Sequence, residues 1–551
     1  MTHPLAGQAA TPRWREILVT GLLAALVYSS LFGVDTLWPT HYSWLLQGDT
    51  AQHYLGWQFF RQDPWQWPPG RILSFGYPLG TTIVFTDSLP LLALLLKPIS
   101  SLLPPEFQYF GIWILACYVL NGYFGLRLVA RYTPHVALRI LGASFFILSP
   151  PLLLRGYGHE SLMAHWLLLA SIDTCLRGWS WPRWLLWSAI AALCHPYLLL
   201  MVLGFMAASA ATAVWIDKTH RLRMVLLQGA GMGLALALLM GLAGHFSSSG
   251  PLQAEGYGYF NMNSLSLIDP LLDWSRYIRQ RPVHPDYAVL GNFGQYEGFL
   301  YLGAGMIVLV VMALTLHLAR PQPLARRWWP LVAVGLLFWL LALSNVVTFG
   351  EQRLFTIPLS DALHRALSIF RASGRLGWPA FYLINLAALM LVLRHLPPRT
   401  ALVVLTAALA LQVADQRDKH LEFRGLIQTR MAWQTPLQSP QWAAQAQRAK
   451  ALVLVPPLPD MTLAYIPFAH LAARYHLATN AANISHVGTS GVGSYGATVL
   501  NALQNQQYDP QTLYIFPLPQ GADQLPPAWQ SHLLTLDGYR VLPPGLSLPL
   551  P

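Results

Sequence analysis

The chain has 551 residues, of which 54% are hydrophobic and only 10% are charged. A soluble globular chain usually carries about 25% charged residues, so the composition excludes an ordinary soluble protein and indicates a polytopic membrane protein. Basic residues outnumber acidic ones by 34 to 23, but they stand in short clusters between apolar runs. This pattern is typical of cytoplasmic membrane loops and argues against a nucleic-acid partner.

Eleven apolar runs predict eleven transmembrane helices. The first run is too long for a signal peptide and has no clear small-residue cleavage site after it, so we expect a permanent span. Several other runs are shorter than the roughly 20 residues that a crossing helix needs. The predicted spans are 17–34, 107–130, 137–153, 161–177, 183–195, 196–215, 222–244, 298–318, 328–346, 375–393 and 400–414.

Arginine and lysine residues orient these spans. With a cytoplasmic N-terminus, the basic clusters from Arg13 to Arg399 all fall in cytoplasmic loops. The short run from Leu89 to Leu103 would reverse every later loop if it crossed the membrane, so we expect it to lie on the outer surface. At His195-Pro196 two spans meet with almost no loop, and one long span there would reverse the downstream orientation.

This topology places four sizeable segments on the outer side. They are residues 35–106, 245–297, 347–374 and the tail from about 415 to 551. Loops of such length usually carry function, so we expect the chemistry on the outer face. The chain then divides into a transmembrane domain, residues 1–414, and an extracytoplasmic domain, residues 415–551.

The tail has the pattern of a small soluble α/β domain. Residues 451–455 and 512–517 predict buried strands, and residues 462–476 predict a helix. Gly491 to Gly496 match G-x-G-x-x-G, but no apolar strand precedes them, as a dinucleotide fingerprint requires. We therefore expect a glycine-rich loop there and no nucleotide cofactor.

The first outer loop opens on Gly48-Asp49, followed by His53 and Arg61. On a helix, Asp49 and His53 share one face and Arg61 lies further along it. An acid, an imidazole and a guanidinium on one stripe indicate a site, in which Asp49 would act as a general base or a metal ligand and the other two would bind substrate. Asp87 in the same loop is either a further catalytic acid or a helix cap.

Two further acids stand at the outer ends of predicted spans. His159 and Glu160 form part of a short outer turn, in which His159 is expected to bind substrate. A carboxylate at the mouth of a span is costly unless it is paired or hydrated, so Glu160 is expected to be a supporting catalytic acid, with a helix N-terminal charge as the alternative. Glu297 precedes the eighth span, and it is either a substrate-binding acid or, as we favour, a helix-start carboxylate.

Candidate phosphate and sugar contacts lie in the later loops. Arg371 and Arg375 are four residues apart, a spacing that would put two guanidiniums on one helix face to grip a phosphate group, or to anchor the helix among lipid headgroups. Tyr257 and Asn261 belong to a run rich in aromatic and amide groups. Such groups bind sugar faces, but they also line membrane interfaces.

These features resemble the GT-C superfamily of integral-membrane glycosyltransferases. The similarity spans most of residues 15–415 and lies in the plan of the chain: a first span, a long outer loop that opens on Gly48-Asp49 with His53, an interfacial helix, spans with basic ends and a C-terminal outer domain. The chain resembles most a group of uncharacterised bacterial multi-pass proteins, in three motifs, Gly48-Asp49 with His53, Gly298 to Gly303 after Glu297, and Phe370 to Arg375.

The resemblance implies an all-α membrane domain in a bacterial cytoplasmic membrane and a sugar donor linked to a polyprenyl phosphate or diphosphate. The acceptor would be a glycan, a lipid or a protein, and Asp49 would be the base or metal ligand. The paired acids usual in the superfamily are absent here, so a requirement for Mg²⁺ or Mn²⁺ is an open alternative.

We therefore expect a glycosyltransferase that works on the outer face of the membrane. The alternatives are a lipid or glycan translocator and a non-catalytic assembly protein on the same scaffold. A translocator needs polar groups along a path through the bilayer, and the predicted spans carry few charges.

Overall fold

The computed structural model describes residues 11–247, 257–281, 292–321, 323–456, 463–483 and 489–546. The chain divides into two units. Unit 1 comprises Met1–Leu37, Phe110–Leu236 and Ala254–Ile427, and unit 2 comprises Trp38–Tyr109, Ala237–Gln253 and Gln428–Pro551. The first long loop and the C-terminal segment thus belong to the same unit, although most of the helical region separates them in the sequence.

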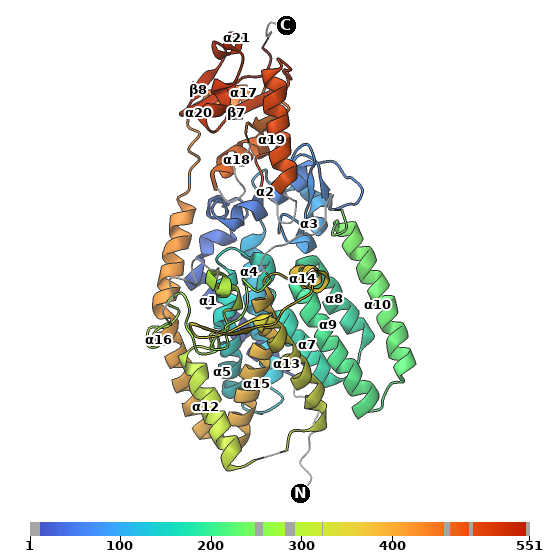
Figure 1. Ribbon diagram of the computed structural model, residues 1–551. Helices are drawn as coiled ribbons and strands as arrows, with labels where there is room; N and C mark the ends of the chain where they lie inside the picture. The colour runs from blue at the N-terminus through green and yellow to red at the C-terminus, as the bar shows by residue number, and fades with distance from the viewer. Residues whose placement is uncertain are drawn as a thin grey trace. The chain divides into compact units, whose positions relative to one another are not determined.

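Unit 1 consists mainly of helices (Figure 1). A short hairpin, β3 (Val346–Phe349) and β4 (Gln352–Thr356), and short 3-10 turns join them. The helices are α1 (Trp14–Leu31), α4 (Phe110–Val129), α5 (Val136–Ile147), α6 (Pro150–Arg155), α7 (Trp166–Arg177), α8 (Trp181–Cys194), α9 (Pro196–Ala211), α10 (Leu222–Ala243), α12 (Ala304–Ala319), α13 (Trp329–Leu343), α14 (Asp361–Ser368), α15 (Trp378–His395) and α16 (Pro398–Met431). The last residues of α10 and of α16 belong to unit 2.

Within the described residues, eight continuous helical stretches are long and apolar enough to cross a membrane, and each corresponds to one predicted span. Some of them join consecutive segments, such as α5 with α6 in Val136–Arg155 and α13 with the turn before it in Arg326–Leu343. The count of eleven is therefore wrong. The predicted spans 161–177, 183–195 and 298–318 form α7, α8 and α12, which have 12, 14 and 16 residues. At 1.5 Å per residue such helices reach only about 18 to 24 Å, short of the roughly 30 Å apolar core of a bilayer.

The region around His195-Pro196 forms two helices rather than one. Helix α8 ends at Cys194 and α9 begins at Pro196, because proline cannot continue the hydrogen-bond ladder of the preceding helix. The backbone N–H of Tyr197 donates to Nδ1 of His195 at 3.3 Å, which caps the start of α9.

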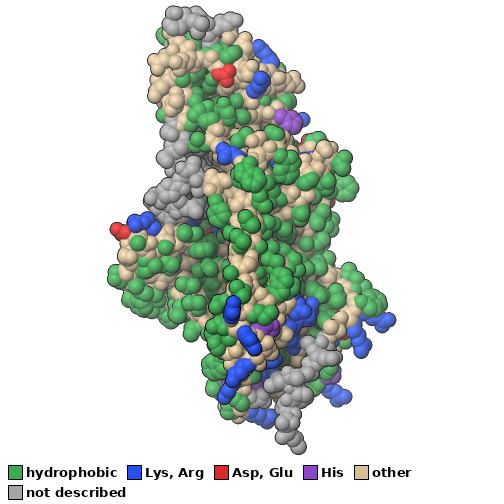
Figure 2. Space-filling view, turned by 90° about the vertical axis from the view of Figure 1, so that its right-hand side faces the viewer, with side chains coloured by type: hydrophobic (Ala, Val, Ile, Leu, Met, Phe, Trp, Pro, Cys, Tyr) green, Lys and Arg blue, Asp and Glu red, His purple; other side chains and the backbone are tan. Residues whose placement is uncertain are grey.

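Loops predicted to be cytoplasmic meet at one end of unit 1. Asp173 of α7 forms ion pairs of 2.7 to 3.1 Å with three arginines, Arg127, Arg131 and Arg177. The guanidinium of Arg394, at the end of α15, lies 5.3 Å from the centroid of the Tyr132 ring. Figure 2 shows lysine and arginine side chains gathered toward one end of the helices. Such clustering is what the positive-inside rule predicts for a membrane protein.

The long helices of unit 1 turn apolar side chains outward. Leu26 of α1, Leu227 of α10 and Leu340 of α13 are each more than half exposed, and apolar side chains cover much of the surface in Figure 2. An apolar surface of this extent is unfavourable in water, and continuous helices satisfy their own backbone groups in lipid. The helical unit therefore fits a membrane-embedded protein.

Unit 2 contains a five-stranded sheet with the order β6-β5-β7-β9-β8. Strand β5 is parallel to β6 and β7, and β9 is antiparallel to β7 and β8. The elements of this region are α17 (Gln441–Ala446), β5 (Ala451–Leu454), α18 (Ile466–Arg474), β6 (Ala478–Thr479), α19 (Thr489–Gln504), β7 (Thr512–Phe516), α20 (Pro519–Asp523), α21 (Pro527–Gln530), β8 (Leu534–Leu536) and β9 (Tyr539–Leu542).

These elements confirm the predicted α/β character of the tail. The two predicted strands are β5 and β7, and the predicted helix is α18. Val453, Phe516, Leu503 and Trp529 belong to one buried apolar cluster that holds the sheet to its helices. The expected glycine-rich loop is wrong, since Gly491 to Gly496 lie within α19.

The first long loop also belongs to unit 2. It contains α2 (Asp49–Gln62), β1 (Arg71–Ile72), β2 (Thr81–Thr82), α3 (Pro90–Leu96) and a 3-10 helix, η3 (Lys97–Leu102). The backbone N–H of Thr479 in β6 donates to the carbonyl of Ser74 at 2.7 Å, and Phe75 forms a parallel bridge with Thr479. The loop therefore extends hydrogen bonding beyond the β6 edge of the sheet.

Candidate functional site

Asp49 is the first residue of α2 and its side chain is exposed. The preceding Gly48 has φ +61°. Residues with a side chain adopt this conformation only with strain, so glycine permits the sharp change of backbone direction at the start of α2. Burial raises the pKa of the Tyr465 hydroxyl, and the nearby Asp49 carboxylate raises it further. An exposed carboxylate at a helix start is accessible to a substrate, as a general base must be.

The other predicted residues of this loop lie deeper in unit 2. His53 is buried. The guanidinium of Arg61 donates to the main-chain carbonyls of Ser100, Leu103, Pro104 and Pro105 at 2.6 to 3.2 Å. These bonds attach α2 to η3 and to the residues that follow it. Asp87 is partly buried and has φ +54°, and the residue that precedes α3 is Leu89 rather than Asp87.

Unit 1 holds a buried cluster in which two arginines share one carboxylate. Nη1 of Arg155 donates to Oε2 of Glu297 at 2.6 Å, and Nε of Arg375 donates to the same oxygen at 2.8 Å. Arg155 ends α6, Glu297 lies in the 3-10 helix η6 (Asn292–Gly298), and Arg375 lies in the 3-10 helix η8 (Ser373–Gly377). We call these three residues the arginine–glutamate cluster.

The electrostatics of this cluster favour an ionised carboxylate with excess positive charge around it. Burial alone would raise the pKa of the Glu297 carboxyl, but the guanidiniums of Arg375 and Arg155 hold that pKa well below its usual range, and His159 acts in the same direction. One carboxylate then faces two guanidiniums. A buried group with a surplus positive charge suits an anionic ligand.

Aromatic rings surround both guanidiniums. The Arg375 guanidinium carbon lies 5.1 Å from the centroid of the Tyr197 ring, and that of Arg155 lies 5.5 Å from the Trp378 ring. Tyr197 is itself fixed, because its hydroxyl accepts a hydrogen bond from the backbone N–H of Ala372 at 2.7 Å. Arginine stacks on aromatic faces through its planar guanidinium, so the rings hold the donors in place.

The predicted pair of Arg371 and Arg375 does not form on one helix face. Helix α14 ends at Ser368 and η8 begins only at Ser373, so the two residues do not share a helix. Arg371 is exposed, with its guanidinium 5.6 Å from the Phe260 ring, whereas Arg375 is buried on Glu297. The helix that would have aligned them is absent from this stretch.

A close backbone contact explains how Arg375 reaches Glu297. A Cβ at Gly374 would stand 2.5 Å from Cα of Gly298, so only glycine permits this approach of η8 to η6. The second guanidinium, that of Arg155, was not predicted to belong to a site. A signal was present, because Arg155 is a charged residue directly after an apolar run, away from the basic loops.

His159 and Glu160 follow Arg155 closely in the chain. The backbone N–H of His159 donates to the carbonyl of Arg155 at 2.8 Å, and the side chain of His159 is partly buried. Glu160 is fully buried, and its carbonyl accepts a hydrogen bond from Nε1 of Trp113 at 2.8 Å. His159 also helps to hold the pKa of the Glu297 carboxyl below its usual range.

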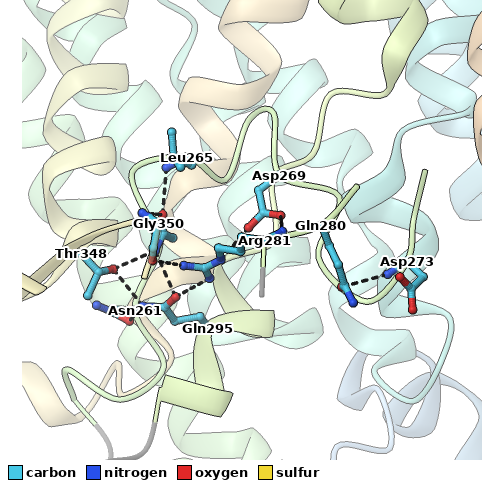
Figure 3. Close-up of polar contacts among 10 residues, drawn as sticks. Asn261, Leu265, Asp269, Asp273, Gln280, Arg281, Gln295, Thr348 and Gly350 are labelled. Atoms are coloured by element: carbon cyan, nitrogen blue, oxygen red, sulfur yellow. Dashed lines mark hydrogen bonds and ion pairs between the residues drawn. The ribbon is translucent and has the colours of Figure 1, made fainter. Parts of the chain in front are cut away.

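A polar network supports η6 and therefore Glu297 (Figure 3). Nε2 of Gln295 donates to Oδ1 of Asn261 at 3.1 Å and to Oγ1 of Thr348 at 2.8 Å, and Nη2 of Arg281 donates to Oε1 of Gln295 at 2.6 Å. Arg281 is also paired with Asp269 at 2.7 Å. Asn261, predicted to contact a sugar, is fully buried within this network.

Tyr257 lies closer to the surface than Asn261. It is partly buried, and its ring meets His364 of α14 edge-on, with 6.1 Å between the ring centroids. Among the residues that the structure describes, no group of three or more His, Cys, Asp or Glu side chains is placed to hold a metal ion.

His470 of α18 makes unit 2 sensitive to acid. Burial and the charge of Arg474 lower the pKa of His470 to about 4, and its ring contacts those of Tyr42 and Trp433. Below the ordinary histidine pKa of about 6.5 the unfolded chain binds a proton that the folded chain does not. Stability should therefore fall by about 2 kcal/mol between pH 7.5 and pH 5.

The measurement for this prediction is the free energy of unfolding at pH 7.5 and pH 5, for the wild type and for His470→Gln. The variant should lose less stability on acidification than the wild type. His532→Gln, a change at an exposed histidine of the same unit, should behave like the wild type. An equal acid loss in His470→Gln and the wild type would contradict the assignment.

Comparison with known families assigns most of the chain. Residues 21–417, which are 397 of the 551, match the family described as Domain of unknown function (DUF6311). Residues 441–544 match the DUF6311 C-terminal domain. No curated protein matches the chain. The chain therefore belongs to the DUF6311 family.

Proposed function

We propose that the protein is a membrane glycosyltransferase that moves a sugar from a polyprenyl phosphate or diphosphate to a glycan, lipid or protein acceptor. The observation that carries the proposal is the arginine–glutamate cluster, with two buried guanidiniums for one carboxylate. Guanidinium binds phosphate oxygens in a bidentate manner. The outward apolar faces of the long helices in the same unit suit a donor with a lipid tail.

The proposed reaction needs a general base for the acceptor hydroxyl and a cationic site for the phosphate leaving group. The acceptor hydroxyl gives its proton to a general base as its oxygen attacks the anomeric carbon of the sugar. We propose Asp49 for this base on its own exposure at the start of α2. The bond from the anomeric carbon to the phosphate oxygen breaks, and its electron pair stays on the phosphate. Arg155 and Arg375 stabilise the negative charge that develops on this leaving group. Glu160 and Asp87 remain proposed supporting acids.

The test is sugar transfer by the purified full-length protein in lipid nanodiscs. Radiolabelled sugars are supplied on polyprenyl phosphate and, in parallel, on a nucleotide diphosphate, with and without EDTA. We expect transfer from the lipid-linked donor alone, and loss of transfer in EDTA would add a divalent cation to the mechanism.

Two results would contradict the proposal. One is transfer from the nucleotide-linked sugar alone. The other is movement of a fluorescent lipid across vesicles without any transfer, which would favour a translocator.

A further inference from the structure

Three buried side-chain nitrogen atoms without a hydrogen-bond partner belong to Trp378 and to two residues beside it, at the arginine–glutamate cluster. Nε of Arg155, Nε2 of His165 and Nε1 of Trp378 have no hydrogen-bond partner among the described residues, and all three residues are at most 1% exposed. The His165 ring lies 4.1 Å from the Trp378 ring between centroids, and the Arg155 guanidinium carbon lies 5.5 Å from it. His165 and Arg155 thus both lie beside Trp378.

Each of these groups is best satisfied by an acceptor. Arginine Nε and tryptophan Nε1 can only donate. Nδ1 of His165 lies 2.7 Å from the hydroxyl of Tyr382, and if that hydroxyl donates to Nδ1, the proton of the neutral imidazole is on Nε2. A buried donor left unsatisfied costs about 1 to 3 kcal/mol. These three donors lie beside the surplus positive charge of the arginine–glutamate cluster. A ligand with oxygen acceptors and negative charge would satisfy both.

We propose that Arg155, His165 and Trp378 form a binding site for a phosphate oxyanion. The site deepens the proposed function, because the same phosphate chemistry belongs to a lipid-linked sugar donor. It does not depend on the transfer reaction. The oxyanion is either the headgroup of a polyprenyl phosphate or a free phosphate, and both present the same oxygens to the three donors.

The experiment measures how far each probe raises the thermal unfolding midpoint of the full-length protein in detergent, since a ligand that binds the folded state stabilises it. The probes are farnesyl phosphate, its neutral analogue farnesol, and inorganic pyrophosphate. A shift with farnesyl phosphate but not farnesol supports a lipid headgroup as the occupant. A shift with pyrophosphate supports a free phosphate. Equal shifts with farnesyl phosphate and farnesol and none with pyrophosphate, or no shift with any probe, would overturn the site.

The variant is Trp378→Phe, which removes the indole N–H and keeps an aromatic ring beside Arg155. Losing one donor to a charged group should weaken phosphate binding about tenfold or more. The matched control is Trp184→Phe, since Trp184 of α8 is also fully buried with a partnerless indole N–H but lies on another helix. The control should bind like the wild type.

Equal phosphate affinity in the Trp378 and Trp184 variants would also overturn the site. The midpoint of each variant without ligand separates a folding defect from a binding defect. If Trp378→Phe loses binding while the wild type transfers no sugar, the proposed glycosyl transfer fails and the phosphate site stands.

Discussion

Replacing Asp49 with asparagine should lower the rate of sugar transfer by about 10²- to 10⁴-fold, the range that a positioned general base contributes. Asparagine keeps the size of the side chain and loses the basic oxygen. Because Asp49 is exposed at the first position of α2, its replacement should leave the unfolding midpoint close to that of the wild type. The measurement is kcat for transfer from a labelled polyprenyl-phosphate sugar.

The matched control for Asp49 is Asp361→Asn. Asp361 is also an exposed aspartate at the first position of a helix, α14, so the substitution removes the same favourable charge from a helix start. Transfer by this control should stay at the wild-type level. Wild-type kcat in folded Asp49→Asn would remove Asp49 from the catalytic role and leave the loop with a structural one.

Replacing Glu297 with glutamine should cost about 3 to 5 kcal/mol of folding free energy, because it leaves two guanidiniums buried without their counter-charge. The pKa of Glu297 is lowered in the folded state, so its ion pairs stabilise the protein above about pH 4. That stability is lost only as the pH falls through the lowered pKa. The difference between wild type and variant should therefore stay constant from pH 8 to pH 5.

The control for Glu297 is Asp418→Asn. Asp418 pairs with Arg276 at 3.5 Å, and both side chains are about half exposed, so the loss should stay under about 1 kcal/mol. Unfolding free energies at pH 7 compare the two variants. A loss in Glu297→Gln no larger than in the control would show that the two guanidiniums do not rely on this carboxylate.

Phosphate offers a second readout on the same variant. The arginine–glutamate cluster in Glu297→Gln has two positive charges and no carboxylate, so an oxyanion ligand should stabilise this variant more than it stabilises the wild type. The measurement is the rise of the unfolding midpoint with pyrophosphate. A smaller rise in the variant would indicate that the cluster does not take part in phosphate binding.

Local features of the sequence were sufficient for the membrane character and for the small C-terminal domain. These features are the apolar runs, the basic loops and the hydrophobic pattern of residues 451–455 and 512–517. Each is contained within a short stretch of sequence, so it can be recognised without knowing which other segments pack against it in the folded chain. The number of crossing helices was overestimated, because a run such as 161–177 is continuous in hydrophobicity while its helix, α7, begins only at Trp166.

Tertiary structure alone decided the composition of the candidate site. Glu297 was read from the sequence as a helix-start carboxylate, and Arg375 as the partner of Arg371. In the folded chain, Arg375 instead meets Glu297 across a separation of 78 residues, and Arg155 joins it across 142. Helical spacing predicts contacts only between residues about one turn apart in the same helix. These ion pairs instead join segments that are distant in the sequence. The approach of η8 to η6 that forms the pair of Arg375 with Glu297 requires the close backbone contact at Gly374.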